Sequence, residues 1–392
     1  MNLSLLLLLV VTFEFAFTEP ILRSVNSFSN RLYSVLPKID NLIFSPLSLH
    51  DSLSTAYQGA AGSTASAIRN ALNLTELRST AGSYRNMLKT LRSSQDVHVE
   101  VASRIFIAND IELKKDFRSR LDSFFSDIQK INFAQRVEAI NQINGWVKET
   151  THHRINHLLG EEDVKEDSQV YLLSAVYFKG EWLRKFPRAR TSEFYVTETE
   201  KKECLMMEQA GKVYYGENRE LNAEILKIPY KDEKFACVIV LPRKINGLPD
   251  LEEKLKEMDL SILTLMTTEQ HVRMVLPKFK VETTFPFNNP LKQLGLSEIF
   301  SNSANFSKMV ENEDLKVDKV IQKAVINFNE DGTEATAANA ATVLMKSAEF
   351  FRAQFIANHP FIFYVTAQLG HESDPSTLLI LFMGKVTTPE YE

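Results

Sequence analysis

The sequence predicts one large α+β domain. Helix-like and strand-like patterns mix along its 392 residues without an internal repeat. No Pro/Gly/Ser-rich linker and no abrupt change of composition divides the chain, although its length alone suggests about two or three domains. Hydrophobic residues make up 44% of the chain and charged residues 24%, which excludes wholesale disorder, and the 26 Phe residues indicate a large aromatic core.

The charge and the cysteine count narrow the class of protein further. The formal net charge is −5, so the chain lacks the general basic footprint of a nucleic-acid-binding protein. The two cysteines, Cys204 and Cys237, are too few for disulfides to stabilise a fold of this size, so the burial of apolar side chains must stabilise it. Cys237 stands in an apolar strand pattern, which favours burial over nucleophilic chemistry. Whether the two cysteines pair is left open.

The N-terminus predicts a secretory signal peptide over residues 1–18. Leu5–Val11 is an unbroken apolar run that is too short to span a membrane, which needs about 17–25 residues. It fits the apolar region of a signal peptide, and Ala16 and Thr18 are small residues placed for a cut before Glu19. The alternative is a buried N-terminal helix.

No later segment reaches membrane-spanning length, so we expect a secreted, extracellular, soluble protein without a membrane partner. Two N-x-S/T sequons follow the signal, at Asn73 and Asn305. Such sequons are frequent by chance, and secretion is what makes these two candidate glycosylation sites.

Three helices are indicated along the chain. Ser45 as N-cap and Pro46 in the first turn mark the start of one. The other two have amphipathic patterns and span Asn141–His157 and Leu251–Met258. In the first of these, residues at i, i+3 and i+4 predict one buried face: Ile143, Trp146 and Val147.

Four strands have continuous or nearly continuous β-rich apolar runs. They are predicted over Val170–Phe178, Phe235–Pro242, His271–Phe279 and Leu378–Val386. The run Val170–Phe178 has no polar face, which is typical of a strand covered on both sides.

Enzyme and metal motifs are missing. There is no G-x-S-x-G, no P-loop and no G-x-G-x-x-G, so we expect no enzyme, no catalytic residues and no cofactor. Three histidines could suggest zinc, but the Glu of H-E-x-x-H is missing, and a solvated helix end explains them: His152, His153 and His157. The acidic run Glu161–Asp163 lacks the alternating ligands of a calcium loop and is interpreted as a solvated turn.

One basic strip at helical spacing has two interpretations. It would bind a polyanion, or it is an ordinary solvated helix face, which we favour. Its residues are Arg85, Lys89 and Arg92.

The segment after the alternating strand Lys323–Asn329 does not fit an ordinary domain. Asp331-Gly332 offers a turn, and a simple β-hairpin is the local expectation. Thr333–Ala341 then has small side chains and no large apolar anchor, and no convincing core face follows before Asn358. Segments of that length without a core face are usually functional or disordered.

Asn329–Ala338 (NEDGTEATAA) resembles the hinge of an inhibitory serpin. Other serpin-like motifs follow one another along nearly all of the chain: Asn41–Ser48, Ala175–Trp182, Val275–Phe279, Leu294–Phe300, His359–Phe363 and Phe382–Val386. The resemblance implies a single serpin domain over residues 19–392 and a monomer. The implied fold has three β-sheets, about nine helices and an exposed reactive-centre loop at about residues 332–357.

In the family, the cleaved loop inserts as a new strand into the largest sheet, and side chains alternate between the two faces of a strand. The hinge residues implied here are Glu330, Gly332, Thr333, Glu334, Ala335, Thr336, Ala337 and Ala338. Four loop residues would turn inward: Thr333, Ala335, Ala337 and Asn339. Three of them are small, whereas Asn339, where the family commonly has Thr, would bury an amide that needs partners.

The family's spacing from the hinge glycine to the scissile bond implies a reactive bond at Lys346-Ser347. The rival bond is Arg352-Ala353. A Lys before the cut implies a trypsin-like serine protease, held as a covalent acyl complex by suicide inhibition. The alternative is a non-inhibitory serpin that acts as a carrier or binding protein. Such carriers usually have bulky or charged residues in the hinge, whereas the hinge here is largely intact.

The resemblance also implies a hydrogen-bonded shutter beneath the insertion site and an aromatic residue at the breach, where the loop enters. The matching residues are Ser45, Ser48, Ser174, Gln322 and, at the breach, Trp182. The family usually has Asn in place of Ser174 and His in place of Gln322. Either the longer Gln322 compensates for the shorter Ser174, or the shutter is rebuilt around water.

Overall fold

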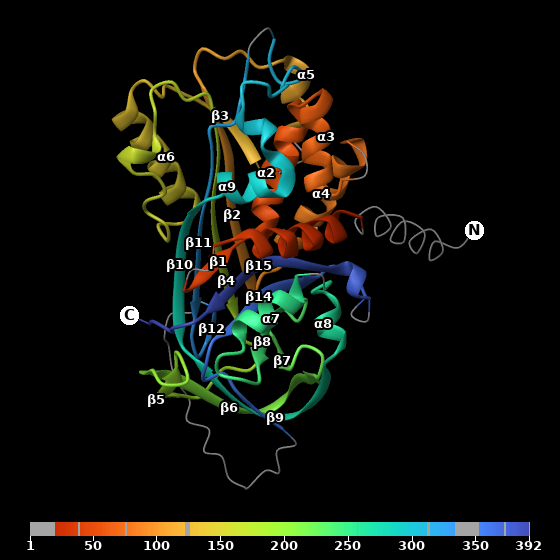
Figure 1. Ribbon diagram of the computed structural model, residues 1–392, viewed down its shortest axis with the longest axis vertical. Coiled ribbons are helices and arrows are strands. Elements are labelled where there is room, and N and C mark those ends of the chain that lie inside the picture. The colour runs from red at the N-terminus through yellow and green to blue at the C-terminus, as the bar shows by residue number, and fades with distance from the viewer. Residues whose placement is uncertain are drawn as a thin grey trace, which may run out of the picture.

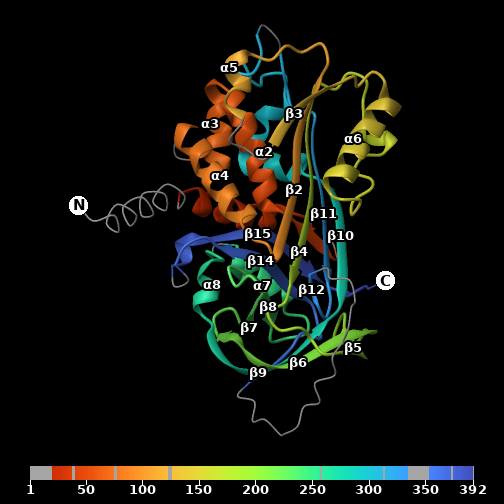
Figure 2. The ribbon, with the colours of Figure 1, turned by 180° about the vertical axis from the view of Figure 1, so that it is seen from behind.

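The computed structural model describes residues 20–37, 40–74, 77–121, 126–256, 258–311, 314–333, 353–371 and 374–391. The described strands form two sheets, one of six strands and one of nine, with helices packed against them (Figures 1 and 2). The predicted signal peptide, residues 1–18, lies outside the described residues.

The six-stranded sheet runs along the long axis of the molecule (Figure 1). Its order is β10 (Phe279–Pro286), β11 (Lys319–Phe328), β12 (Gly332–Thr333), β4 (Val170–Glu181), β2 (Val97–Ala108) and β3 (Ser126–Ile131). β11 and β4 pair directly and in parallel up to Val325 and Tyr177. Beyond that point β12 lies between them, antiparallel to both. The sheet therefore has its sixth strand at one end only.

The nine-stranded sheet combines what the sequence predicted as separate sheets. Its order is β1 (Leu42–Phe44), β15 (Leu378–Val386), β14 (Phe361–Gln368), β8 (Phe235–Pro242), β7 (Ala223–Pro229), β6 (Lys201–Asn218), β9 (Thr268–Pro277) and β13 (Ala353–Ile356), with β5 (Ala189–Tyr195) also paired to β6. β6 is long enough to pair with β5 near its start and with β7 near its end. For that reason the described strands give two hydrogen-bonded sheets instead of three.

The helices are one over residues 20–35, α2 (Pro46–Gly59), α3 (Gly62–Ala71), α4 (Leu77–Arg92), α5 (Lys115–Arg118), α6 (Arg136–Thr150), α7 (Leu248–Leu255), α8 (Ile262–Leu265) and α9 (Asn288–Leu291). α2 is buried along its whole length and contacts β2, β4 and β15. Its predicted start is confirmed, because the Ser45 hydroxyl accepts a hydrogen bond from the Ser48 N–H. α2 therefore brings its N-terminus to the sheet.

α6 covers the opposite face of the six-stranded sheet and corrects one prediction. Its buried face is the expected one, and Trp146 packs edge-on against Phe106 of β2. However, the helix ends at Thr150, not at His157. His152 has a φ of 48°, and the Asn144 side chain accepts hydrogen bonds from the backbone of the segment that follows.

His153 and His157 consequently do not share a helix face. Among the described residues, no group of three or more His, Cys, Asp or Glu side chains is placed to hold a metal ion. Glu161–Asp163 forms one turn of 3₁₀ helix at the surface, as a solvated turn should.

The other element predictions differ mainly at boundaries. The strands predicted at Phe235–Pro242 and Leu378–Val386 are β8 and β15. The prediction His271–Phe279 is wrong at its end, because β9 stops at Pro277 and Phe279 begins β10 in the other sheet. The helix predicted at Leu251–Met258 is α7, which starts and ends earlier. At its C-terminal end the Asn30 side chain donates to the carbonyls of Leu255, Lys256 and Met258.

Both cysteines are free thiols. Cys237 is buried in β8, and burial raises its pKa; burial also raises the pKa of the half-buried Cys204, to about 11. Neither thiol is therefore activated as a nucleophile. In the part of the chain that the structure describes, no helix is long and apolar enough to cross a membrane.

Candidate functional site

The candidate site is the line along which β4 and β11 meet, here called the seam. At one end of the seam lies the breach, where β12 separates the two strands: Trp182, Tyr230, Gly332 and Thr333. In its middle lies the shutter: Ser45, Ser48, Ser174 and Gln322. Both groups lie on the seam, but the breach consists mainly of packed aromatic side chains and the shutter of hydrogen-bonded polar side chains.

The backbone of the breach already contains the beginning of an added strand. Gly332 pairs with Glu181 of β4, and Thr333 pairs with Gly180 of β4 and with Phe328 of β11. Gly332 has a φ of 156°, and a Cβ there would lie 2.0 Å from the Gly180 carbonyl oxygen. Only glycine fits between the strands at this point.

The side chains of the breach form an aromatic cluster around Thr333. Trp182, 1% exposed, stacks on Tyr230 with ring centroids 4.5 Å apart, and its edge contacts Phe328. The Thr333 side chain is fully buried, with its hydroxyl 2.8 Å from the Tyr230 hydroxyl. Burial raises the Tyr230 pKa well above its usual value, so the phenol stays neutral and able to share this bond.

A tight turn connects β11 to β12. The Asn329 side-chain oxygen accepts hydrogen bonds from the backbone N–H groups of Asp331 and Gly332. The Trp182 indole N–H donates to the Asn329 carbonyl at 2.9 Å, and the Trp182 backbone N–H donates to the Asp331 carbonyl. The turn predicted from Asp331-Gly332 is thus fixed against β4 as well as against β11.

Two ion pairs hold the same turn from outside. Glu330 pairs with Lys278 at 2.8 Å, and Asp331 pairs with Lys185 at 3.2 Å. Partial burial alone would lower the Lys185 pKa, but the carboxylates of Asp331 and Glu181 raise it above its usual value. Both lysines therefore neutralise the acidic residues of the hinge.

The shutter is a buried hydrogen-bond cluster beneath the seam. Gln322 of β11 and Ser174 of β4 are register partners, and all four shutter residues are at most 2% exposed. The Gln322 amide nitrogen lies 2.6 Å from the Ser48 hydroxyl and 3.3 Å from the Ser174 hydroxyl. The Ser48 hydroxyl lies 3.3 Å from that of Ser174. Gln322 therefore reaches Ser174 directly.

The backbone of Ser45 fixes the orientation of the Gln322 amide. Its N–H donates to the amide oxygen at 2.7 Å, and its carbonyl accepts from the amide nitrogen at 3.0 Å. The bonds that join β11 to α2 are thus shorter than the two contacts with Ser174, which lie at the long end of the usual range. β4 is the more weakly held side of the seam.

The structure places only part of the predicted hinge and loop. Glu330, Gly332 and Thr333 meet at the breach with Trp182. Nine predicted residues of the hinge and loop lie outside the described residues: Glu334, Ala335, Thr336, Ala337, Ala338, Asn339, Lys346, Ser347 and Arg352. The chain is described again from Ala353, which begins β13.

The sequon asparagines and the basic strip do not lie on the strands of the seam. Asn73 and Asn305 of the sequons are exposed. Arg85, Lys89 and Arg92 all lie on α4, where Arg85 and Lys89 are exposed.

Several residues that form or contact the breach and its turn were given no role there by the sequence. They are Tyr230, Asn329, Lys185, Lys278 and Gly180. Tyr230 and Thr333 are 103 residues apart, so no local pattern connects them. A glycine near the end of an otherwise apolar strand, Gly180, was the one available signal for a close backbone approach.

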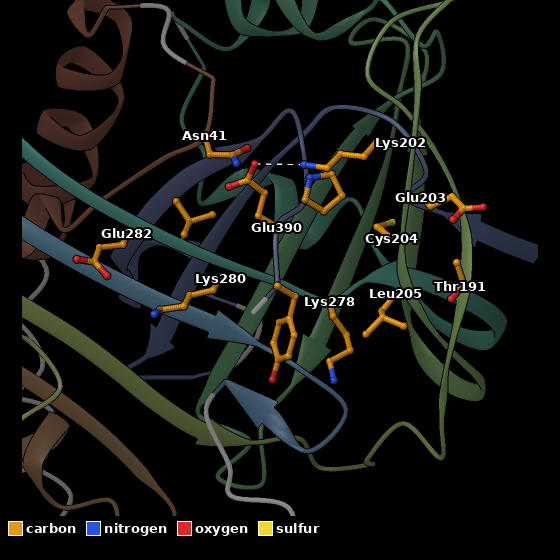
Figure 3. A pocket seen from close by; sticks show the side chains of 13 residues that line it. Asn41, Thr191, Lys202, Glu203, Cys204, Leu205, Lys278, Lys280, Glu282 and Glu390 are labelled. Carbon is orange, nitrogen blue, oxygen red and sulfur yellow. Dashed lines mark hydrogen bonds and ion pairs between the residues drawn. The ribbon is translucent and has the colours of Figure 1, made fainter.

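A cavity of about 850 Å³ lies beside the hinge, between β6, β10 and the C-terminal segment (Figure 3). Lys278 lines it and also pairs with Glu330. Three other charged residues on its wall are paired: Lys202 and Glu390 with each other, and Glu282 with Lys323. With most of its charges paired, the cavity has no strong preference for a ligand of one sign.

Comparisons with known proteins agree with this geometry. The family model described as serpin (serine protease inhibitor) matches residues 23–389. Antichymotrypsin-2 of Bombyx mori is 32% identical over 87% of this chain and 93% of its own length, and antitrypsin of Bombyx mori is 31% identical over 86% and 88%. The solved structure of Serpin48, a highly specific serpin of the insect Tenebrio molitor, matches with a TM-score of 0.83 and 31% identity over 94% of this chain and 97% of that one.

These matches confirm the predicted fold, and the matching family model describes its family as serine protease inhibitors. The chain belongs to the serpin family.

Proposed function

We propose that this serpin is a secreted suicide inhibitor of an extracellular trypsin-like serine protease, cleaved at Lys346-Ser347. The observation that carries the proposal is β12. Gly332 and Thr333 already lie between β11 and β4, paired with both. Continuing this strand requires only that the seam open further.

The existing register supports insertion of the small hinge residues. Continued antiparallel pairing would put Ala335 between Ile326 and Phe178, on the same face as Thr333. Ala337 would follow between the next pair on that face. Because Ile326 and Phe178 belong to the main buried cluster, the inserted face must be small and uncharged, as it is here.

The outward positions fit the same register. Glu334 would lie beside Lys179 of β4 and Asn327 of β11, on the solvent side of the strand. Lys179 is only partly buried, and the Asn327 side-chain oxygen is buried without a hydrogen-bond partner in the described structure. A carboxylate there would meet a cation across the strand.

The chemistry follows the serine protease reaction. The Lys346 side chain occupies the acidic specificity pocket, and the protease serine attacks the Lys346 carbonyl. The peptide bond breaks, the Ser347 amine takes a proton and leaves, and an ester joins Lys346 to the enzyme. Insertion then carries the enzyme with the loop before water can cleave the ester. The intact form is a kinetic trap whose release drives this motion.

The position of β13 favours Lys346-Ser347 over the rival bond Arg352-Ala353. Ala353 pairs with Val272 of β9. A protease binds several residues on both sides of the bond that it cuts, in an extended conformation. At Arg352-Ala353, the residues after the cut would first have to leave the sheet.

Three further roles belong to the proposal. Residues 1–18 direct secretion, and the exposed Asn73 and Asn305 carry glycans. The α4 residues Arg85, Lys89 and Arg92 are a solvated face, with polyanion binding as the alternative. The protein acts as a monomer.

The test is incubation of the purified protein with trypsin. We expect an SDS-stable complex and a released peptide that begins at Ser347. Lys346→Glu should abolish both, because it sets a carboxylate against the acidic pocket of the protease. A peptide that begins at Ala353 would overturn the reactive bond. If the protein formed no complex with any of a panel of serine proteases and was cleaved by none of them, the result would favour a carrier or binding protein.

A further inference from the structure

Lys278 connects the hinge to a part of the chain that lies far from it in the sequence. It stands between β9 and β10, and its backbone N–H donates to the Leu205 carbonyl of β6 at 2.7 Å. Its ammonium group pairs with the Glu330 carboxylate of the hinge at 2.8 Å. The same group lies 4.2 Å from the centroid of the Tyr391 ring. One cation therefore contacts both the hinge and the segment 387–391.

The Lys278 side chain is poorly solvated. It is 12% exposed, and the Glu330 side chain is 28% exposed. A cation withdrawn from water depends on its protein partners, whereas an exposed lysine can exchange them for water. The face of an aromatic ring carries a negative electrostatic potential and attracts such a cation. Among the described residues, Glu330 and Tyr391 are the partners that Lys278 has for its charge.

Backbone and side-chain contacts hold the segment 387–391 in place. The Asn41 side chain donates to the Thr388 carbonyl at 2.7 Å. The Lys280 backbone N–H donates to the Glu390 carbonyl at 2.7 Å. The Glu390 carboxylate also pairs with Lys202 of β6 at 3.2 Å, as Figure 3 shows. The aromatic ring that follows Glu390 is thus fixed in position by contacts with β10 and β6.

The backbone of Glu330 belongs to the turn that leads into β12. Its carbonyl accepts a hydrogen bond from the Phe186 N–H at 2.8 Å. The side chain of Glu330 is held separately, by Lys278. A weaker ion pair with Lys278 would therefore loosen the turn, and the Phe186 amide would report the change.

We propose that Tyr391 is a positioning residue for the hinge and acts through Lys278. Its ring keeps the ammonium group beside the Glu330 carboxylate and limits the access of water to the pair. The segment 387–391 is then a place from which the hinge can be loosened without any contact with the reactive loop. This inference goes beyond the proposed function, because a carrier with the same hinge would have the same coupling.

The test measures hydrogen exchange of the Phe186 amide in the intact protein for the wild type, Tyr391→Leu and Tyr391→Phe. Tyr391→Leu keeps apolar bulk but removes the ring, so exchange should become several-fold faster. Tyr391→Phe keeps the ring face and should match the wild type. The amides of β8, which is paired on both sides, are the internal reference and should not change. If Tyr391→Leu matched the wild type, or if both variants exchanged equally faster, the ring would not position the hinge.

A second comparison tests whether Tyr391 acts through Lys278. Lys278→Met keeps an apolar stem and removes the charge. This change alone should speed exchange of the Phe186 amide, and adding Tyr391→Leu should then have no further effect. An equal effect of Tyr391→Leu in both backgrounds would show that the ring acts by another route, and it would overturn the inference.

The protease assay and the exchange measurement can fail separately. A wild type that forms no complex with any protease, while Tyr391→Leu still loosens the hinge, would overturn the proposed function and support the positioning role. A wild type that traps trypsin, while the Phe186 amide exchanges alike in all three proteins, would overturn the positioning role alone.

Discussion

The breach and the shutter close the same seam in opposite ways. At the breach, two residues of an added strand already separate β4 from β11, and the surrounding contacts are aromatic, such as the stack of Trp182 on Tyr230. At the shutter, β4 and β11 are still paired, and polar contacts to Ser174 cross the gap. The seam already contains an added strand at the breach, whereas at the shutter it has to be opened for one.

The difference follows from the range of the two kinds of contact. Apolar packing is non-directional and can re-form around an added strand, whereas hydrogen bonds fail within about an ångström of their ideal length. The shutter therefore controls how far insertion proceeds. Because Gln322 and Ser48 contact Ser174 only at 3.3 Å, the seam should open by moving β4 away from β11 and α2.

The largest expected effect is at the breach. Thr333→Arg would put a cation where the side chain is fully buried and bonded to Tyr230, which costs several kcal/mol unless the charge is paired. Insertion would then be slower than deacylation. The variant should be cut by trypsin after Lys346 and act as a substrate, with cleaved serpin accumulating and protease activity recovering in a timed gel assay.

The matched control is Thr333→Ser, which keeps the hydroxyl and should trap the protease normally. If Thr333→Arg trapped trypsin as well as the wild type does, the loop would not enter the sheet, and the role given to the seam would be wrong.

The next effect is at the shutter. Gln322→Ala would leave the buried Ser45 N–H without its acceptor, at a cost of about 1–3 kcal/mol, whereas the Ser45 carbonyl would keep the Ser48 hydroxyl and the Leu49 N–H as donors. The intact protein should lose several degrees in its thermal midpoint by calorimetry. An unchanged midpoint would mean that the shutter does not hold the seam closed.

Tyr230→Phe isolates the contact between the Tyr230 and Thr333 hydroxyls at the breach. It removes the partner of the Thr333 hydroxyl but keeps the stack on Trp182, so the intact protein should lose about 1 kcal/mol. Hydrogen exchange of the Gly332 and Thr333 amides should become faster, while that of the shutter strands stays the same. Equal acceleration at both ends would contradict their independence.

The smallest effect is expected from Ser174→Ala. This change removes only the two long contacts to β4 and costs about 0.5–1 kcal/mol. Gln322 keeps its bonds to α2, so exchange should become faster in β4 and not in α2. If α2 exchanged faster instead, β4 would not be the side of the seam that moves.

Local patterns in the sequence predicted the elements that depend on local rules. The fully apolar run from Val170 gave a strand covered on both faces, and Ser45-Pro46 gave a capped helix start. The end of α6 could not be predicted, because the Asn144 side chain binds the following segment and the chain turns at His152. The junction of β9 and β10 at Lys278 likewise depends on a backbone bond to distant Leu205.

The site was predicted where a motif carries the residue and missed where a partner lies far away in the sequence. Ser45, Ser48 and Trp182 stand in motifs along the chain, the resemblance implied Ser174 and Gln322, and the structure brings these two together as register partners. Tyr230 stands in no motif, and Lys278 stands in one, but both stabilise the hinge through contacts that only the folded chain creates. Their importance depends on tertiary position, which local periodicity does not encode.

The thermal midpoints of the intact and the loop-cleaved wild-type protein test the central claim most directly. If the strand that begins at Gly332 and Thr333 extends along the seam, cleavage in the loop completes the sixth strand of the sheet. The midpoint should then rise sharply. An unchanged or lower midpoint after cleavage would show that the seam does not accept the loop, and it would contradict the inhibitory mechanism.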